Sequence, residues 1–550
     1  MTSALSTSGR RINPWVVLAL ACIPVFVGSL DLTIVSAFLP EIIVNLELPV
    51  QTVLDDAAWI VTGYLLAYTI SMIIMGRASD LIGRRRAFII CLVIFMVGSF
   101  IVAEVDPNAR DGFSGLIYDV VYRLQGTRPD PGSSALLAIV IGRVVQALGA
   151  GAIVPVSLAL VGDLFPADKR AKPLGLIGAV DTLGWVLGHL YGGVMVNLFS
   201  QHRATFESWI ASLGLDWGAP DWRTLFWINL PISLIALVAT WWVLRGAPQV
   251  RASGRFDWLG ALLITGALTC LVLGLGANID IAASTSGFDE LGGLPPYAVP
   301  LLLFAAVLFA AFAFVELRSR DPLLDLRIFR RRNIAMGSIA NAFVGFCLVI
   351  GLVSVPILVN IRQPDASTLA QAALQVGILL SALTVPMALA AVPGGWLSDR
   401  FGQRAAAITG FVLALIGFVL IWQTWTLDLA DGVIALEMAL VGVGLGLTFS
   451  PISASVINSA EADHLGTASA LVIIMRLLGM TVGVSLLTAL ASQRLSILAA
   501  GELSGLGGDP FAALDVYARL TVQVLTEISL LGALLCAAAV IPALLLRKTD

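Results

Sequence analysis

The sequence predicts an all-α polytopic membrane protein, and three observations support this fold class. The 550-residue chain is 58% hydrophobic. Only 12% of its residues are charged, against about 25% in soluble domains. Its apolar residues form continuous runs of about 20 residues or more, the length that a helix needs to cross a bilayer. The composition therefore excludes a soluble fold, and it also excludes disorder, which requires low hydrophobicity and high charge.

Fourteen apolar runs are long enough to be transmembrane helices. The first follows Arg10 and Arg11 and is about 25 residues long, which exceeds the apolar core of a signal peptide. No small-x-small cleavage site follows it, so we expect an uncleaved first span. The predicted spans are 15–39, 57–76, 86–104, 135–160, 174–198, 224–244, 258–277, 298–317, 334–358, 371–396, 405–425, 433–455, 466–490 and 522–546.

Lysine and arginine residues are distributed unevenly over the segments between these spans. If the N-terminus is cytoplasmic and the sides alternate, 22 of the 32 basic residues lie in cytoplasmic segments and 8 lie outside. The other two, Arg143 and Arg476, lie within spans. This bias follows the positive-inside rule. It predicts a multi-pass protein of the cell (plasma or inner) membrane with both termini in the cytoplasm.

Four predicted outside loops are unusually long and rich in Asp, Gly and Pro. We expect them to form a solvated cap with short helices, such as one near 115–124. The loops lie at 105–134, 199–222, 278–297 and 491–521.

A short cytoplasmic motif occurs twice. The first copy runs from Gly76 to Arg86 between the second and third spans, and the second runs from Gly395 to Arg404 between the tenth and eleventh. In each copy an aspartate can cap the N-terminus of the following helix, a glycine allows a tight turn, and arginines extend to the cytoplasmic face. The duplication predicts a latch between helices that opens and closes. The expected gating residues are Gly76, Asp80, Gly83, Arg84, Gly395, Asp399, Gly402 and Arg404.

The repeat divides the chain into two blocks of six spans with a further pair between them. Two six-span halves around a site in mid-membrane are a known transporter plan. The predicted segments are a cytoplasmic N-terminus (1–14), an N-terminal six-helix bundle (15–244), an inserted helix pair with basic cytoplasmic linkers (245–332), a C-terminal six-helix bundle (333–546) and a cytoplasmic tail (547–550).

These motifs resemble those of the major facilitator superfamily over essentially the whole chain. Gly76–Arg86 is similar to its cytoplasmic loop motif, and Arg143–Gly151 is similar to its fourth-span motif, with Ala147 in place of a common glycine. The resemblance implies a major facilitator fold, with two six-helix bundles plus two inserted helices. Besides the inserted pair, three segments resemble the fourteen-span drug:proton antiporter branch: Leu30–Pro40, Trp222–Pro231 and Gly466–Gly479.

The fifth span departs from the antiporter motif of that branch, which reads roughly G-x-x-x-G-P-x-x-G-G. In this chain His189 takes the place of the proline. The replacement removes a helix bend and adds a side chain that titrates near neutral pH. The glycines remain, and they predict a smooth helix-packing face made of Gly184, Gly188, Gly192 and Gly193.

Ionisable residues within the spans are the candidates for coupling protons to substrate, because charges in a bilayer are costly and mark function. We expect Asp31 to be the main proton and substrate carboxylate with Arg143 as its counter-ion; a static salt bridge between them is the alternative. Asp181 and His189 lie on roughly the same face of the fifth span, which permits a relay of two carboxylates and a histidine. Two further candidates are Arg476, as a pivot that pairs with another span or with substrate, and Glu437, near the exit, where Glu527 also lies.

The resemblance favours a secondary active transporter that exports hydrophobic or cationic drugs by proton-coupled alternating access. The alternatives are a proton-coupled exporter of a lipid, siderophore or secreted metabolite, and a proton symporter that imports a polar solute. An enzyme or a scaffold has no support, since Walker, zinc-protease and serine-hydrolase motifs are absent from the sequence. The expected partners are the bilayer, a small-molecule substrate and protons. We expect a monomer without cofactor or metal, and no nucleic-acid binding, because the net charge of −4 gives no basic footprint.

Overall fold

The computed structural model describes residues 13–35, 39–48, 57, 59–108, 111–212, 220–243, 245, 251–275, 297–362, 369–461, 464–502 and 510–547. In this part of the chain the regular secondary structure is helical and no strand occurs.

Thirteen of the described helices are long and apolar enough to cross a membrane, which confirms the predicted fold class. The remaining predicted span, 174–198, lies within the 31-residue helix α8 (Ala171–Gln201). The thirteen are α1 (Pro14–Ile34), α4 (Trp59–Ile82), α5 (Arg84–Ala103), α7 (Pro131–Leu164), α10 (Trp222–Val243), α11 (Trp258–Leu275), α13 (Ala298–Arg318), α14 (Arg332–Arg362), α15 (Leu369–Phe401), α16 (Gln403–Thr424), α17 (Asp431–Asn458), α18 (Leu465–Glu502) and α19 (Pro510–Leu544). Shorter helices are α2 (Leu39–Asn45), η2 (Ala167–Lys169), α6 (Gly112–Gln125), α9 (Arg203–Ser212) and η4 (Leu326–Arg330).

Two helices begin with the same local signal. Asn13 accepts a hydrogen bond from the backbone N–H of Trp15, and Pro14 occupies the first position of α1. Asp130 accepts one from Ser133, and α7 likewise begins with a proline. A short polar cap followed by proline satisfies a free N–H and fixes φ for the first turn, so these starts follow from the sequence.

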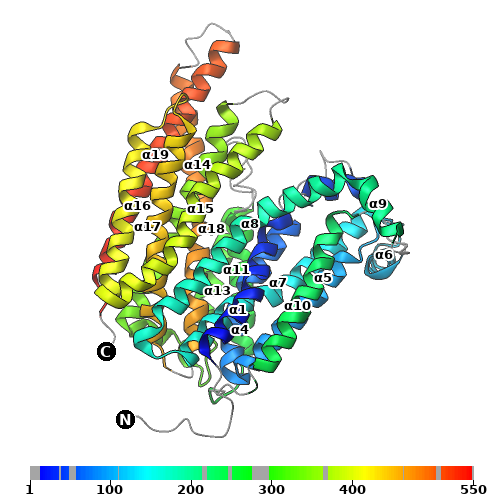
Figure 1. Ribbon diagram of the computed structural model, residues 1–550, viewed down its shortest axis with the longest axis horizontal. Helices are drawn as coiled ribbons and strands as arrows, with labels where there is room; N and C mark the ends of the chain where they lie inside the picture. The colour runs from blue at the N-terminus through cyan, green and yellow to red at the C-terminus, as the bar shows by residue number, and fades with distance from the viewer. Residues whose placement is uncertain are drawn as a thin grey trace.

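The helices form two groups (Figure 1). In the N-terminal group, α1 to α10, both α4 and α5 pack on α7, and α1 packs on α8. In the C-terminal group, α14 to α19, both α15 and α16 pack on α17, and α14 packs on α18. The groups meet where α4 contacts α18 and α8 contacts α15. The inserted helices α11 and α13 pack on each other, and α11 also contacts α4 and α18. The exact domain bounds stay a prediction.

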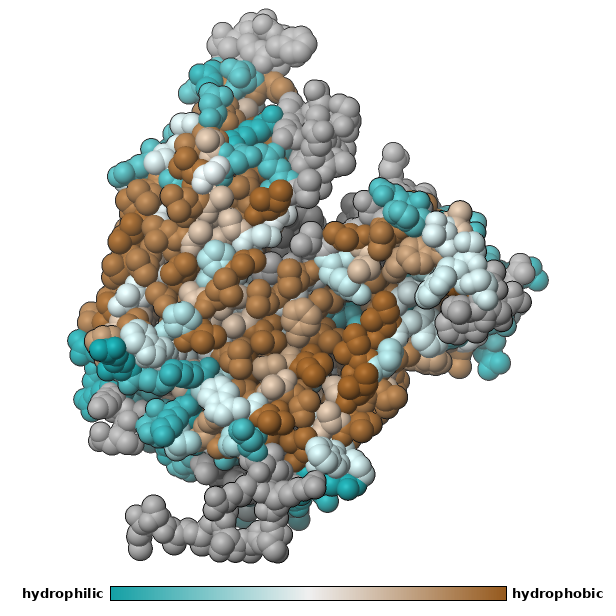
Figure 2. Space-filling view, viewed as in Figure 1, coloured by the Kyte–Doolittle hydropathy of each residue, from teal (hydrophilic) through white to brown (hydrophobic). Residues whose placement is uncertain are grey.

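The two groups lie close together at the end where α1 begins and α19 ends, which we call the terminal side, and they diverge toward the opposite, open side (Figure 1). Figure 2 shows a cleft between them at the open side. It also shows hydrophobic residues over the middle of both groups and hydrophilic residues toward the ends, as expected for helices that face lipid.

Each copy of the repeated motif forms a one-residue turn. Gly83 separates α4 from α5 with a φ of 92°, and Gly402 separates α15 from α16 with a φ of 90°. Residues with a Cβ atom rarely adopt this left-handed region. The spacing of the motif therefore leads to the same helix–turn–helix geometry in both groups.

The predicted outside loops contain more helix than expected. α6 covers the short helix predicted near 115–124, and α9 lies in the loop 199–222. The prediction of a loop at 491–521 is wrong, because α18 continues to Glu502 and α19 begins at Pro510. With 38 residues at 1.5 Å each, α18 is about 57 Å long, well beyond the ~30 Å hydrocarbon core. The helix therefore continues beyond the apolar run from which the span was predicted. Nearly all of the loop 278–297 lies outside the described residues.

Candidate functional site

A cavity lies between the two helix groups. The cavity has a volume of about 60 Å³, and its walls come from α1, α4 and α8 on one side and from α14, α15 and α18 on the other. Its polar lining residues are few: Ser29, Tyr68, Asp181, Thr182 and Arg476. The others are apolar: Leu32, Leu65, Trp185, Leu348, Met387, Ile473, Leu477 and Met480.

One ion pair at this cavity connects the two groups. The Oδ2 atom of Asp181 in α8 lies 3.5 Å from Nη2 of Arg476 in α18. Ser29 of α1 donates a hydrogen bond of 2.6 Å to the other carboxylate oxygen of Asp181. The Arg476 guanidinium also lies 4.7 Å from the ring centroid of Phe449. The two charged side chains are 15% and 8% exposed, so a proton or a substrate in the cavity can reach them.

A second ion pair is enclosed within the N-terminal group. Arg143 Nη1 lies 2.5 Å from Asp31 Oδ2, and Arg143 Nη2 donates to the backbone oxygen of Asp31 at 3.0 Å. Asn229 donates to the remaining oxygen of Asp31 at 2.8 Å, and Gln146 accepts from Arg143 at 2.6 Å. The Tyr64 ring lies 3.9 Å from the guanidinium.

Neither Asp31 nor Arg143 lines the cavity, and their side chains are at most 1% exposed. Every charged oxygen of Asp31 has a donor. This geometry corresponds to the static salt bridge that the sequence leaves open, and the role of Asp31 as the main proton and substrate carboxylate stays a prediction.

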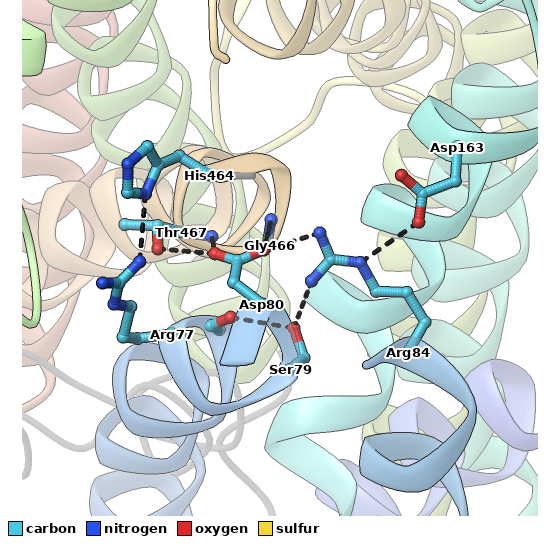
Figure 3. Close-up of polar contacts among 9 residues, drawn as sticks. Arg77, Ser79, Asp80, Arg84, Asp163, His464, Gly466 and Thr467 are labelled. Atoms are coloured by element: carbon cyan, nitrogen blue, oxygen red, sulfur yellow. Dashed lines mark hydrogen bonds and ion pairs between the residues drawn. The ribbon is translucent and has the colours of Figure 1, made fainter. Parts of the chain in front are cut away.

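A polar cluster joins α4 to α18 on the terminal side (Figure 3). Asp80 accepts hydrogen bonds from the backbone N–H groups of Gly466 at 2.8 Å and Thr467 at 3.1 Å, and from the Thr467 hydroxyl at 2.9 Å. Both residues lie in the first turn of α18, so the carboxylate sits at the positive end of that helix. Arg84 lies 2.5 Å from Asp80 and also contacts Asp163 of α7 at 3.4 Å. We call this cluster the latch.

Further contacts close the terminal side around the latch. Arg77 of α4 lies 3.1 Å from the Nδ1 atom of His464, just before α18 (Figure 3). Arg170 donates to Asn458 of α17 at 3.1 Å, and Asn458 donates to the backbone of Ala167 at 3.0 Å. The helices α4 and α18 approach closely at Gly76, where a Cβ atom would lie 2.8 Å from that of Ala470.

The prediction that the motif aspartates cap the following helices is wrong. The helices α5 and α16 both begin without a side-chain cap. Asp80 lies in the last turn of α4 on a face that points at α18, and the turn at Gly83 carries the chain away from it. A carboxylate on that face binds the helix opposite rather than the next one.

The second motif copy makes no equivalent latch. Asp399 and Arg404 are exposed, and neither forms a hydrogen bond or ion pair among the described residues. α8, the helix that faces this copy, begins without a side-chain cap. The contact there is made by packing, because a Cβ atom on Gly395 would lie 2.8 Å from the backbone oxygen of Ala171. Ser450 of α17 donates a hydrogen bond to the same oxygen.

The other predicted carboxylates lie away from the cavity. Glu437 accepts hydrogen bonds from the Thr424 hydroxyl at 2.8 Å and the Trp425 indole at 3.0 Å, inside the C-terminal group. Glu527 pairs with Arg494 at 2.8 Å between α18 and α19. These contacts stabilise helix pairs.

The glycines of α8 face α1. A Cβ atom on Gly184 would lie 2.6 Å from the backbone oxygen of Phe26, and one on Gly188 would lie 2.1 Å from the Thr33 hydroxyl. Gly192 is also buried. The side chain of His189 and the environment of Gly193 lie outside the described residues, so the relay through His189 stays a prediction.

Sequence reasoning did not point to Ser29, Asn229, Ser450, Asn458 or His464, which all make contacts described above. Asn229 falls in the segment Trp222–Pro231 that carries the resemblance, which is the one signal that singles it out. Charge singles out ionisable residues within a predicted span but not uncharged polar ones. Only the fold shows which of the uncharged polar residues form contacts.

Comparison with known proteins fixes the family. The family profile described as Major Facilitator Superfamily matches residues 21–362 and 364–514. The chain belongs to the major facilitator superfamily. It is therefore a transporter. The fourteen-span drug:proton antiporter branch stays a prediction.

Among curated relatives of this superfamily member are two mycobacterial proteins. A triacylglyceride transporter of Mycolicibacterium smegmatis is 30% identical over 523 residues, which cover 93% of this chain and 82% of the relative. A triacylglyceride transporter of Mycobacterium tuberculosis is 31% identical over 506 residues, which cover 90% and 85%.

Solved structures share the fold at low identity. The human organic anion transporter MFSD10 gives a TM-score of 0.56 at 16% identity, covering 95% of this chain and 99% of its own. A proton:xylose symporter gives 0.55 at 14% identity, covering 95% and 94%.

Proposed function

We propose that this transporter exports a neutral lipid of the triacylglycerol class by proton-driven alternating access. The observation that carries the proposal is the similarity, over most of the chain, to relatives named triacylglyceride transporters. Lipid export was one alternative from the sequence, and it now takes precedence over the export of drugs.

The chemistry of the cavity supports a lipid. Eight of its lining residues are apolar, and they include Trp185 and four leucines. Acyl chains gain free energy on such surfaces in proportion to the area removed from water. The few polar groups gather at one place, the pair Asp181 and Arg476 with Ser29, which suits the ester groups of a glyceride.

Asp181 is the proposed coupling carboxylate. Its ion pair with Arg476 contributes to joining α8 of one group to α18 of the other. Protonation of Asp181 removes one charge of that pair and weakens the contact between the groups. A ligand moves the equilibrium only through the difference in its affinity for the two states. The coupling therefore requires the proton and the lipid to favour different states.

The proposed direction of transport depends on orientation. We propose that the terminal side is cytoplasmic, as the basic residues indicate, so that the cavity opens to the outside in this conformation. A single cysteine at Ser253, which is exposed on the terminal side, tests this in a variant without the five native cysteines. We expect an impermeant thiol reagent to label it in inside-out vesicles and not in intact cells. Labelling in intact cells would contradict the orientation.

Transport is tested with purified protein in liposomes. We expect a pH gradient to drive labelled triacylglycerol from these liposomes to acceptor vesicles, and we expect collapse of the gradient to stop it. A parallel assay uses ethidium, a hydrophobic cation, because Asp181 and the aromatic Trp185 at the cavity also suit such a ligand. Gradient-driven movement of ethidium without movement of triacylglycerol would reject the lipid and favour drug export.

A further inference from the structure

Two carboxylates meet at the terminal-side end of the inserted helix pair. Asp257 immediately precedes α11, and Glu316 lies in the last turn of α13. Gly260 in α11 faces both of them. A Cβ atom on this glycine would lie 2.3 Å from Oε1 of Glu316 and 3.1 Å from Oδ2 of Asp257. The two oxygens therefore border the same small space.

These two oxygens are the ones that the fold leaves without a donor. Asp257 Oδ1 accepts from the backbone N–H of Gly260 at 2.8 Å, and Glu316 Oε2 accepts from that of Leu324 at 3.2 Å. Asp257 Oδ2 and Glu316 Oε1 are buried, and neither has a hydrogen-bond partner among the described residues. Glu316 as a whole is 2% exposed. A buried carboxylate oxygen without a donor destabilises the folded state, because it loses its water and gains no partner.

The charged groups around the pair do not neutralise it by contact. Neither carboxylate has an ion-pair partner within 4.0 Å in the described part of the chain. Asp321, on the linker after α13, lies against the linker that leads into α11, because its Oδ1 would lie 2.4 Å from a Cβ atom on Gly254.

The cations nearby are directed elsewhere. Arg77 of α4 acts on Glu316 by its charge, but its guanidinium contacts His464. On α13 itself, Arg318 lies over the Phe314 ring. Arg327 of η4 donates to the backbone of Leu317.

We propose that Asp257 and Glu316 share one proton, so that the inserted helix pair contains a proton-binding site. The hydroxyl of protonated Glu316 donates to Asp257 Oδ2, which supplies both oxygens with a partner and removes the repulsion between two carboxylates. The site is separate from Asp181 and Arg476, and it does not depend on lipid export.

The position of the site links it to the latch. Ala252, in the linker that leads into α11, donates a backbone hydrogen bond of 2.8 Å to the backbone oxygen of Asp80. α11 also contacts α4 and α18, the two helices that the latch joins. Loss of the shared proton would push the ends of α11 and α13 apart at this point. It would thereby weaken the hydrogen bond between Ala252 in the linker and Asp80 in the latch.

The first test measures the proton directly. In purified full-length protein, infrared spectroscopy during a pH titration should show the carbonyl band of a protonated carboxylic acid. We expect Glu316→Gln to remove this contribution. We expect Asp257→Asn to remove it too, because its amide can donate to Glu316 Oε1 in place of the proton. Glu527→Gln is the control, because Glu527 is a span carboxylate that Arg494 and Gln523 supply with donors.

The second test uses stability. The folded protein with the shared proton binds one proton more than the unfolded chain, so its stability should fall as the pH rises. The unfolding equilibrium should change about tenfold per pH unit over the range in which the folded protein holds that proton and the unfolded chain does not. We expect this slope to be absent in Glu316→Gln and Asp257→Asn and present in Glu527→Gln.

Three results would overturn the proposal. The first is an infrared band and a stability slope that are unchanged in both carboxylate variants. The second concerns Gly260→Ala, whose added methyl group would occupy the space between the two oxygens. The proposal fails if this variant is as stable as the parent and its stability falls with pH in the same way. The third is stabilisation by sodium over potassium at constant ionic strength that requires Glu316, since the site would then hold a metal cation.

Discussion

Replacement of Asp181 by asparagine should abolish uphill, proton-driven transport while it preserves downhill exchange of the substrate. The amide keeps the size of the carboxylate. Its single oxygen can still accept from Arg476, and its NH2 group can donate to the Ser29 hydroxyl, so it can keep both neighbours of Asp181. It cannot change charge, so the ion pair between α8 and α18 no longer responds to protons. In proteoliposomes we expect gradient-driven transport at background level at every pH, with exchange in the absence of a gradient largely retained.

Two matched variants separate this role from a general effect of losing a buried carboxylate. Glu437→Gln removes a carboxylate that is also buried but contacts only Thr424 and Trp425 away from the cavity, and it should keep the parent pH profile. Asp31→Asn tests the enclosed pair. If it loses uphill transport while Asp181→Asn keeps it, the coupling site is Asp31, as the sequence suggests.

Asp31 and Arg143 illustrate how far the sequence leads to the site. Both lie at similar depth when residues are counted along predicted spans at 1.5 Å each, so their proximity is predictable, and the structure brings them together. What counting cannot give is the direction in which each side chain points. Asp31 points into the N-terminal group and Asp181 to the cavity, because the packing of α1 on α8 sets the rotation of both helices.

The latch illustrates the complementary case. The motif residues and the turn at Gly83 are evident from the repeat, but the partner of Asp80 lies 386 positions away at Gly466. Local rules favour the next helix as the partner, because an aspartate near a helix start is a cap. Tertiary packing places a different helix start within reach. The extended ends of α18 and α19 are missed for another reason, since hydropathy reports the bilayer-embedded part of a helix and not where the helix stops.

The difference between the two motif copies indicates that the structure represents the state that is closed on the terminal side. The first copy is buried and bonded, and the terminal side is closed around it, whereas Asp399 in the second copy is exposed. A transporter that alternates between two states needs contacts that exist in one state and break in the other. We propose that the latch has this property, because the hydrogen bonds of Asp80 run between the two helix groups.

Asp80→Ala should therefore shift the protein toward the state that is open on the terminal side. The variant loses the cap on α18 and the negative charge at the positive end of that helix. Together they stabilise the closed state by about 2 kcal/mol, which corresponds to roughly a 30-fold change in the ratio of the two states. It also leaves Arg84 buried without its closest acid. Asp399→Ala is the matched control and should change the ratio little. Spin labels at Arg86 and Ala405, exposed on the terminal side of the two groups, measure the opening as a longer distance in Asp80→Ala. Equal distances in both variants and the parent would show that the latch contributes nothing to closure, and the motif would then serve to anchor the helices at the membrane surface.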